Sequence, residues 1–145
     1  MRLSTKGRYG VRAMVALALH YGEGPVSVNS ISKEEGISPD YIEQLFIKLR
    51  RKGLIKSRRG PEGGFLLARP PSQIRVGDII RGIEEPITLA PCVEENCSHL
   101  KGCTTHLLWK KIANRIAEIL DSTTLDDFRE ERRGDEKKKI RLHRS

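Results

Sequence analysis

Apolar residues recur at helical spacing through the first third of the chain. After Ser4, apolar side chains at positions 11, 14, 15, 18 and 19 repeat at i, i+3, i+4, i+7 and i+8, which predicts an amphipathic helix that ends near Gly22. Ser27 is suited to cap a second, short helix that extends to Glu35. Gly36 suits the left-handed turn after it, because glycine has no Cβ to oppose that conformation.

A third helix is predicted to begin at Ser38 and Pro39, which place a capping hydroxyl before a proline in the first helical position. Its apolar residues form one stripe, made of Ile42, Leu45, Phe46 and Leu49. The opposite side carries Asp40, Gln44, Ile47 and Arg51, with Tyr41, Glu43 and Lys48 at the flanks. A short helix, a glycine turn and a second helix with an outward polar face predict a helix-turn-helix motif whose reading helix spans residues 38–52.

A segment with a glycine- and proline-rich turn follows the reading helix. Two short apolar runs within residues 54–68 flank that turn, a pattern typical of a β-hairpin. A hairpin in this place predicts the wing of a winged helix. Arg58, Arg59 and Gly60 near its tip are candidate contacts to phosphates or to a minor groove, where a narrow groove concentrates negative potential. The alternative is that the two arginines are solvent-exposed surface residues that do not contact DNA.

Two further helices are predicted beyond the wing. A short one around residues 76–82 is expected to pack on the first helices through Val76, Ile79 and Ile80. A longer one runs from about residue 105 to 120, with one apolar stripe made of Trp109, Ile112, Ala113, Ile116 and Leu120. So much apolar surface on one helix predicts packing against its twin in a homodimer, although packing within the chain is the alternative.

The apolar signal fades after Asp121. Leu125 and Phe128 indicate one more short helix, whereas residues 132–145 are almost all polar or charged and are predicted to be a disordered basic tail. The pattern as a whole predicts a mainly α fold with a small β-hairpin. Its expected parts are a winged helix-turn-helix DNA-binding domain (1–83), a cluster-binding loop (84–104), a dimerisation helix with a short following helix (105–131) and the tail (132–145).

Positive charge is concentrated at the start of the chain. The formal net charge is +8, and residues 1–60 contain 12 Lys and Arg against 5 acidic residues. This imbalance coincides with the predicted reading helix, so it favours double-stranded DNA as a partner. The chain has no apolar stretch long enough for a membrane span and no signal-peptide pattern, so a cytoplasmic protein is expected. Nucleotide-binding loops, nucleophile elbows and paired catalytic carboxylates are absent, so no enzyme is expected.

All three cysteines lie in one polar segment. Cys92, Cys97 and Cys103 precede His106, and these three sulfurs and one imidazole suit an iron-sulfur cluster or zinc. His99 is a rival for the fourth position. The spacing lacks the short Cys-x2-Cys pair common in structural zinc sites, which favours iron-sulfur. Unrelated thiols, a disulfide and redox-reactive cysteines without metal are the alternatives, opposed by the clustering and by the odd cysteine count.

Four segments carry a resemblance to a known family. They are the opening Met-Arg-Leu-Ser-Thr-Lys-Gly-Arg-Tyr-Gly, residues 36–46, the wing turn 59–64 and the run 105–109. Through them the chain resembles the IscR-type winged-helix transcription regulators over residues 1–128. The resemblance implies a homodimer that binds a [2Fe-2S] cluster through Cys92, Cys97, Cys103 and His106. It also implies control of iron-sulfur biogenesis genes, with repression in the cluster-bound form and with cluster-assembly proteins as cluster donors.

The chain departs from the family pattern at two places. The interval between Cys92 and Cys97 is one residue shorter than in the family regulator, and Asp40 stands where a serine is expected. The added carboxylate should weaken or redirect DNA contacts, so the operator sequence does not carry over. Relatives with a four-iron cluster take an acidic ligand from the partner's first helix. Arg8 and Val11 offer none here, which favours the two-iron form.

The expected DNA contacts divide by chemistry. Gln44 and Tyr41 are expected at base edges and Arg59 in the minor groove. Lys48 and Arg51 suit phosphates, and Glu43 suits discrimination between operator classes. The full candidate set is Ser38, Asp40, Tyr41, Glu43, Gln44, Lys48, Arg51, Arg58, Arg59 and Gly60. The alternatives are a DNA-binding regulator that responds to zinc or thiol redox, and a small iron-sulfur redox protein.

Overall fold

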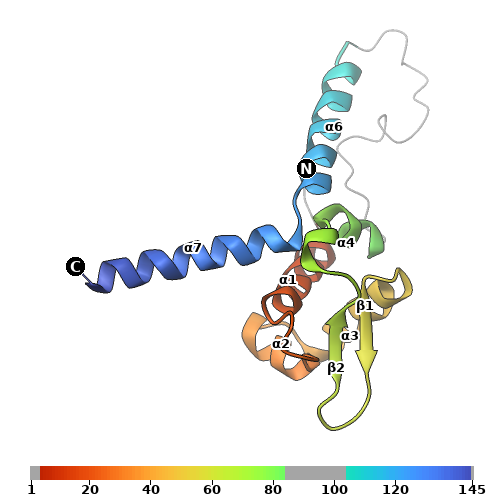
Figure 1. Ribbon diagram of the computed structural model, residues 1–145. Coiled ribbons are helices and arrows are strands. Elements are labelled where there is room, and N and C mark those ends of the chain that lie inside the picture. Colours follow the sequence, from red (N-terminus) through yellow and green to blue (C-terminus); the bar gives the residue numbers. More distant parts are fainter. Residues whose placement is uncertain (1–3, 84–103, 145) are drawn as a thin grey trace.

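The protein is a small helical body with a two-stranded wing and two helices that project from it (Figure 1). The structure is a computed structural model that describes residues 4–83 and 104–144, the last nine of them by backbone alone. Its elements in chain order are α1 (Thr5–Leu19), α2 (Val28–Glu35), α3 (Pro39–Arg51), β1 (Ile55–Arg58), β2 (Gly64–Leu67), the 3-10 helix η1 (Pro71–Gln73), α4 (Val76–Gly82), α6 (His106–Ser122) and α7 (Leu125–Arg144). The mainly α fold with a small hairpin, expected from the sequence, is confirmed.

Serine side chains cap the first three helices. Ser4, Ser27 and Ser38 each accept a hydrogen bond from a backbone N–H in the first turn of α1, α2 and α3, at 3.1, 3.1 and 3.3 Å. Each cap satisfies one of the backbone donors that a helix start leaves unpaired. Gly36 ends α2 in the left-handed region with φ of 66°, so the turn of the helix-turn-helix motif forms where the sequence predicts it.

One hydrophobic core joins these helices to α4. The apolar stripe of α3 is buried in full, and Met14 from α1 and Ile31 from α2 are inaccessible to solvent. Val76, Ile79 and Ile80 of α4 are also buried, as predicted. The fit between α1 and α4 is tight, because a Cβ added at Gly10 would collide with the Ile83 side chain. The core therefore holds the reading helix rigidly against the rest of the body.

The wing is an antiparallel pair in which Ile55 lies opposite Leu67 and Arg58 opposite Gly64. Its base is held by a third segment, because Val26 and Phe65 exchange backbone hydrogen bonds of 2.8 and 2.9 Å. Gly64 permits this approach, since a Cβ there would lie 2.3 Å from the Val26 carbonyl oxygen. The wing is thus fixed to the connection between α1 and α2 as well as to α3.

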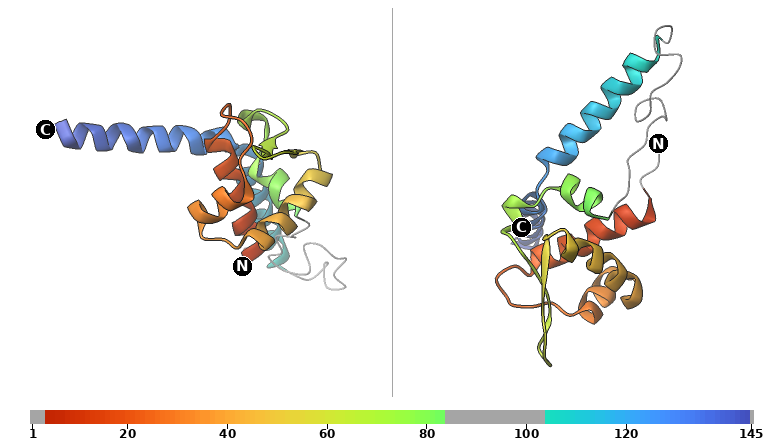
Figure 2. Two further views of the ribbon diagram at one scale, coloured as in Figure 1. Left: turned by 90° about the horizontal axis from the view of Figure 1, so that it is seen from below. Right: turned by 90° about the vertical axis from the view of Figure 1, so that its right-hand side faces the viewer.

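The long helix α6 leaves the body as a projecting arm (Figures 1 and 2). Its C-terminal end is attached to the body through backbone bonds from Val76 N to Thr123 O at 2.9 Å and from Leu125 N to Ile74 O at 3.0 Å. The predicted end near residue 120 is two residues short of the observed one. None of the helices in the described part of the chain combines the length and apolar character that a membrane span requires.

The second projecting helix, α7, differs from the sequence expectation. Leu125 is fully buried and Phe128 packs against the core, as their apolar character indicates. The helix then continues to Arg144, so the tail expected to be disordered after residue 131 is helical. Glutamate, arginine and lysine are good helix formers, and a helix that is polar on every side has no apolar periodicity for sequence analysis to detect.

Candidate nucleic-acid interface and metal ligands

The reading helix presents the polar face that its sequence predicts. Asp40, Glu43, Gln44 and Arg51 are exposed, and Lys48 is half-buried. Ser38 is also exposed, and its hydroxyl accepts the hydrogen bond from Tyr41 N that caps the helix. The free side chains therefore offer carboxylate, amide and guanidinium groups on one side of α3, which is the set of groups that hydrogen-bond to base edges and phosphates.

Tyr41 differs from the other candidates because it is half-buried and its ring packs against the core. It meets the ring of Tyr9 edge to face, with centroids 5.8 Å apart and an angle of 89° between the planes. The Arg12 guanidinium lies over the Tyr9 ring, 5.5 Å from its centroid. Arg12 also forms an ion pair of 3.1 Å with Glu35 at the end of α2. This network ties α1 and α2 to the first turn of α3, so Tyr41 helps to orient the reading helix.

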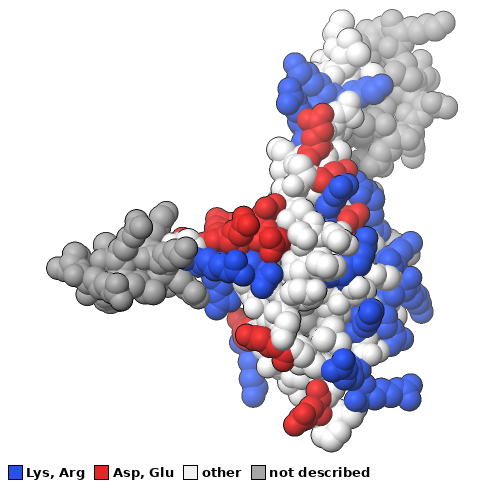
Figure 3. Space-filling view, viewed as in Figure 1, with Lys and Arg blue, Asp and Glu red and all other residues white. Residues whose placement is uncertain are grey.

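The three wing candidates lie at the exposed tip. Arg58, Arg59 and Gly60 are all exposed, and Gly60 adopts a φ of 113°, which a residue with a side chain rarely does. The Arg50 side chain donates a 3.2 Å hydrogen bond to Ser57 and so joins the reading helix to β1. Lys and Arg gather over α3 and the wing in the space-filling view, whereas acidic residues concentrate where α7 leaves the body (Figure 3). The reading helix and the wing therefore share one basic side of the domain.

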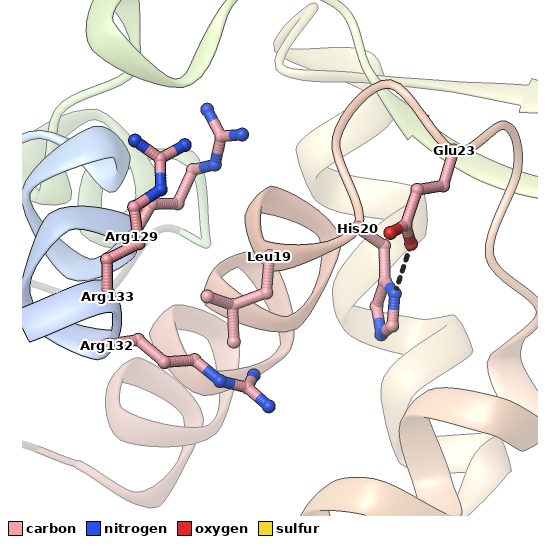
Figure 4. Close-up of a pocket in the computed structure, with 6 residues that line it drawn as sticks. All are labelled: Leu19, His20, Glu23, Arg129, Arg132 and Arg133. Carbon is pink, nitrogen blue, oxygen red and sulfur yellow. Dashed lines mark hydrogen bonds and ion pairs between the residues drawn. The ribbon is translucent and has the colours of Figure 1, made fainter. Parts of the chain in front are cut away.

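A charged cluster at the end of α1 escaped the sequence analysis. His20 Nδ1 lies 2.8 Å from Glu23 and Nε2 lies 3.0 Å from Glu34. The hydrogen bond to Glu23 is the main cause of a raised pKa of His20; burial opposes it and Glu34 reinforces it. Three arginines of α7 line the same pocket as His20, Glu23 and Leu19, namely Arg129, Arg132 and Arg133 (Figure 4). The contact of His20 with Glu34 and the approach of α7 to this pocket join segments that are far apart in the sequence, so no local pattern predicts them.

His106 is the one predicted metal ligand among the described residues. It is the first residue of α6, and its Nδ1 is buried without a hydrogen-bond partner. No other side-chain nitrogen or oxygen in residues 4–83 and 104–135 is left in that state. An unsatisfied buried imidazole nitrogen costs about 1–3 kcal/mol, so its position is suited to a ligand that the lone pair would bind.

The other proposed ligands lie outside the described residues. These are Cys92, Cys97, Cys103 and the rival His99. Within the described part of the chain, no group of three or more histidine, cysteine, aspartate or glutamate side chains is arranged to hold a metal ion. The expectation of a metal site therefore depends on two observations. They are the donor types in the sequence and the unpartnered nitrogen of His106.

The arm α6 leaves apolar side chains uncovered. Leu107 and Ile119 are 72% and 64% exposed, and Leu108 is also exposed. The predicted apolar stripe is half-buried, and no residue of α6 is fully buried. Exposed leucine and isoleucine along a projecting helix favour contact with another protein surface.

The chain is similar to known transcription regulators over most of its length. A profile of the Rrf2 family, described as iron-dependent transcriptional regulator, matches residues 3–131. The HTH-type transcriptional regulator IscR of Sodalis glossinidius (strain morsitans) is 47% identical over 129 residues, which make up 88% of this chain and 78% of the relative.

Solved structures of two transcription regulators are among those that share the fold. The structure of CymR, the global cysteine regulator of B. subtilis, has a TM-score of 0.78 at 44% identity and covers 90% of this chain and 97% of its own. The structure of T. potens IscR has a TM-score of 0.72 at 46% identity and covers 90% of this chain and 88% of its own.

Proposed function

The chain belongs to the Rrf2 family of transcriptional regulators, and from this membership we propose that it senses iron-sulfur cluster status through a [2Fe-2S] cluster and controls genes of iron-sulfur biogenesis. It is a DNA-binding regulator and not an enzyme, as its relatives are named transcriptional regulators. Beyond family membership, the proposal specifies the cofactor, the target genes and repression by the cluster-bound form. Its single strongest support is the buried His106 nitrogen without a partner, just after the three-cysteine segment.

The reading helix α3 is proposed to enter the major groove of an operator. Gln44 is exposed at the centre of the polar face and suits a bidentate contact to adenine, while Glu43 suits a cytosine amino group. Lys48 and Arg51 are assigned to phosphates, and Arg59 at the wing tip to the minor groove. Tyr41 remains a proposed contact. Its ring is committed to Tyr9, so its larger effect is on the orientation of α3.

Cys92, Cys97, Cys103 and His106 are proposed to hold the cluster. The three thiolates and one imidazole are the donor types that iron accepts in such clusters, and the cluster supplies an oxygen-sensitive group whose presence reports iron-sulfur supply. His106 stands at the first residue of α6, so ligation through its ring would tie the preceding loop to the start of that helix. Binding at this place would restrict where the start of α6 points, and in this way cluster occupancy would alter DNA affinity.

Dimerisation through α6 is part of the proposal. Leu107, Leu108 and Ile119 are too exposed for a helix that functions alone in water, and a second copy of α6 would cover them. Two reading helices related by a twofold axis would then bind two operator half-sites. A cytoplasmic location and cluster delivery by assembly proteins follow from the same assignment.

A second candidate function comes from one of the structural relatives. The chain shares 44% identity and the fold with CymR, which is named a global cysteine regulator. A regulator of this kind that responds to thiol chemistry would use the three cysteines without a metal. The two functions differ in whether iron is bound, so they are separable by experiment.

The test is anaerobic reconstitution with iron and sulfide, followed by DNA binding with and without the cluster. We expect visible absorbance, iron and sulfide in equal amounts, and an operator affinity that changes with occupancy. A colourless protein whose DNA affinity responds to thiol oxidants would support the second candidate. Coloured protein with unchanged operator affinity would contradict the sensor proposal.

A further inference from the structure

Ile47 is an exposed apolar residue on the otherwise polar face of the reading helix. It is 48% exposed, although the other large apolar residues of α3 are buried in the core. Within residues 4–83 the exposed large hydrophobic side chains are Ile47 and Tyr21. Tyr21 lies beneath the Arg129 guanidinium, 5.7 Å from the ring centroid, so it has a partner. Ile47 has none of the core contacts that would account for its apolar character.

The position of Ile47 on the helix is at the centre of the outward face. At 100° per residue it lies within about 60° of Asp40, Glu43, Gln44 and Arg51, and on the opposite side from the core stripe. Each of these four neighbours is polar and exposed, so Ile47 extends no apolar patch. Isoleucine is also a poorer helix former than lysine or glutamate, so helix stability does not explain it. A surface residue with no other role would more often be polar here.

We infer that Ile47 contacts the 5-methyl group of a thymine in the major groove and so selects the operator at that base. The inference rests on the proposed function, in which α3 enters the major groove. The thymine methyl is the one apolar group that a base pair presents in that groove, and a branched aliphatic side chain is suited to cover it. Neither a phosphate nor a base amide would gain from a contact with isoleucine.

The spacing to Gln44 predicts where the thymine lies. Three residues along the helix axis span about 4.5 Å, and base pairs stack about 3.4 Å apart, so the two side chains reach base pairs that are one or two steps apart. Gln44 suits adenine. The operator is therefore expected to contain, in each half-site, a thymine one or two base pairs from an adenine that Gln44 reads.

The test replaces single thymines in the operator by deoxyuridine, which removes the methyl group and keeps every hydrogen-bonding atom. High-affinity duplexes are first selected from a random pool with the full chain, and each thymine is then replaced in turn. At one thymine of each half-site, wild-type affinity should fall about fourfold, the equivalent of the ~0.8 kcal/mol for burying one methyl group. The Ile47→Ala protein should bind the thymine and deoxyuridine duplexes equally, and Ile47→Val should be intermediate.

Two controls separate a methyl contact from other effects. Gln44→Ala should remain sensitive to deoxyuridine at the same position, because it retains Ile47. The salt dependence of binding should be the same for Ile47→Ala and wild type, because isoleucine neutralises no phosphate. Ile47 is exposed, so the variants are expected to fold, and circular dichroism with thermal unfolding verifies this before binding is measured.

Two outcomes would overturn the inference. One is a wild-type protein indifferent to deoxyuridine at every thymine. The other is an Ile47→Ala protein that keeps full deoxyuridine sensitivity; an equal loss of affinity for both duplexes would then place the side chain against sugar or backbone. Neither of these outcomes contradicts the proposed function. That proposal is contradicted if operator affinity does not depend on salt concentration, or if it does not depend on cluster occupancy.

Discussion

Arg81 Nη2 in α4 lies 2.6 Å from both carboxylate oxygens of Asp121 in α6, joining residues forty positions apart. The hydrogen bond to Asp121 raises the pKa of the Arg81 guanidinium above its ordinary value. The pair lies at the C-terminal end of α6, whereas His106 is at the other end, about 23 Å away at the rise of an α-helix. A movement of His106 would therefore act on the body through a long helix fixed at one end.

Gly77 of α4 lies directly against this ion pair, which leaves no space for a side chain at that position. A Cβ at position 77 would lie 2.0 Å from Asp121 Oδ1. Gly77→Ala should therefore lower the free energy of unfolding by about 1 kcal/mol, because the new methyl group displaces the carboxylate. In an Asp121→Ala background the same change should be neutral or stabilising, since alanine favours a helix over glycine by up to ~1 kcal/mol. Urea unfolding of the four proteins measures both effects.

A matched control for Gly77 is Gly134, a helical glycine of α7 with open space around it. Gly134→Ala should have the same small effect whether or not Asp121 is present. A Gly77→Ala penalty that persists unchanged without the Asp121 carboxylate would mean that the strain lies elsewhere. The pair itself should contribute at most about 1 kcal/mol, because both side chains are partly exposed to water.

The elements of the DNA-binding domain could be predicted from the sequence because their signals are local. Each of the first three helices has a serine cap and an apolar stripe, and Gly36 alone suffices to mark the turn of the motif. The polar face of α3 follows from the same periodicity, so its exposed residues could be named in advance. The wing was recognisable from its glycines and its place after α3.

The features that escaped prediction depend on contacts between distant segments. The bridge from Val26 to Phe65, the packing of Tyr41 on Tyr9 and the pairing of Arg81 with Asp121 exist only once the chain has folded. No spacing rule relates such partners. The helix beyond residue 131 does not follow from the sequence pattern for a different reason, since this almost entirely polar segment has good helix formers but no apolar period.

The wing arginine Arg59 should contribute one charge to the electrostatic part of DNA binding. Arg59→Ala is expected to weaken operator affinity by about tenfold and to reduce the slope of log affinity against log salt by about one. The reason is that Arg59 is exposed at the wing tip on the basic side of the domain. Arg115→Ala is the matched control, since Arg115 is also exposed but lies on α6. Equal losses for the two variants would indicate a general charge effect and contradict a specific contact by the wing.

His106 should be required for the cluster and dispensable for the fold. His106→Ala removes the buried nitrogen that has no partner, so the protein without metal should be as stable as wild type or more stable. After reconstitution it should lose visible absorbance and bind less iron per chain. His99→Ala is the control, and it should retain the wild-type spectrum. A His106→Ala protein with unchanged absorbance and iron content would assign the fourth ligand to another residue.

His20 should make stability depend on pH in a defined direction. Its imidazole lies between Glu23 and Glu34, and both carboxylates accept hydrogen bonds, so the doubly protonated ring satisfies both contacts. This raises the folded-state pKa of His20 above its ordinary value of 6.5. A raised pKa means that the stabilisation is fully present below about 6.5 and is lost as the pH rises through the folded-state pKa.

The comparison that isolates this effect is urea unfolding of wild type and of His20→Gln from pH 5.5 to 9. The wild-type advantage in unfolding free energy should be largest at the acidic end and shrink as the ring loses its proton. Glu34→Gln should lower the pKa of His20, because it removes one of the two carboxylates that favour the protonated ring. Imidazole resonances in NMR report this change directly. A wild-type advantage that stays constant across the range would show that His20 contributes through packing and not through its charge.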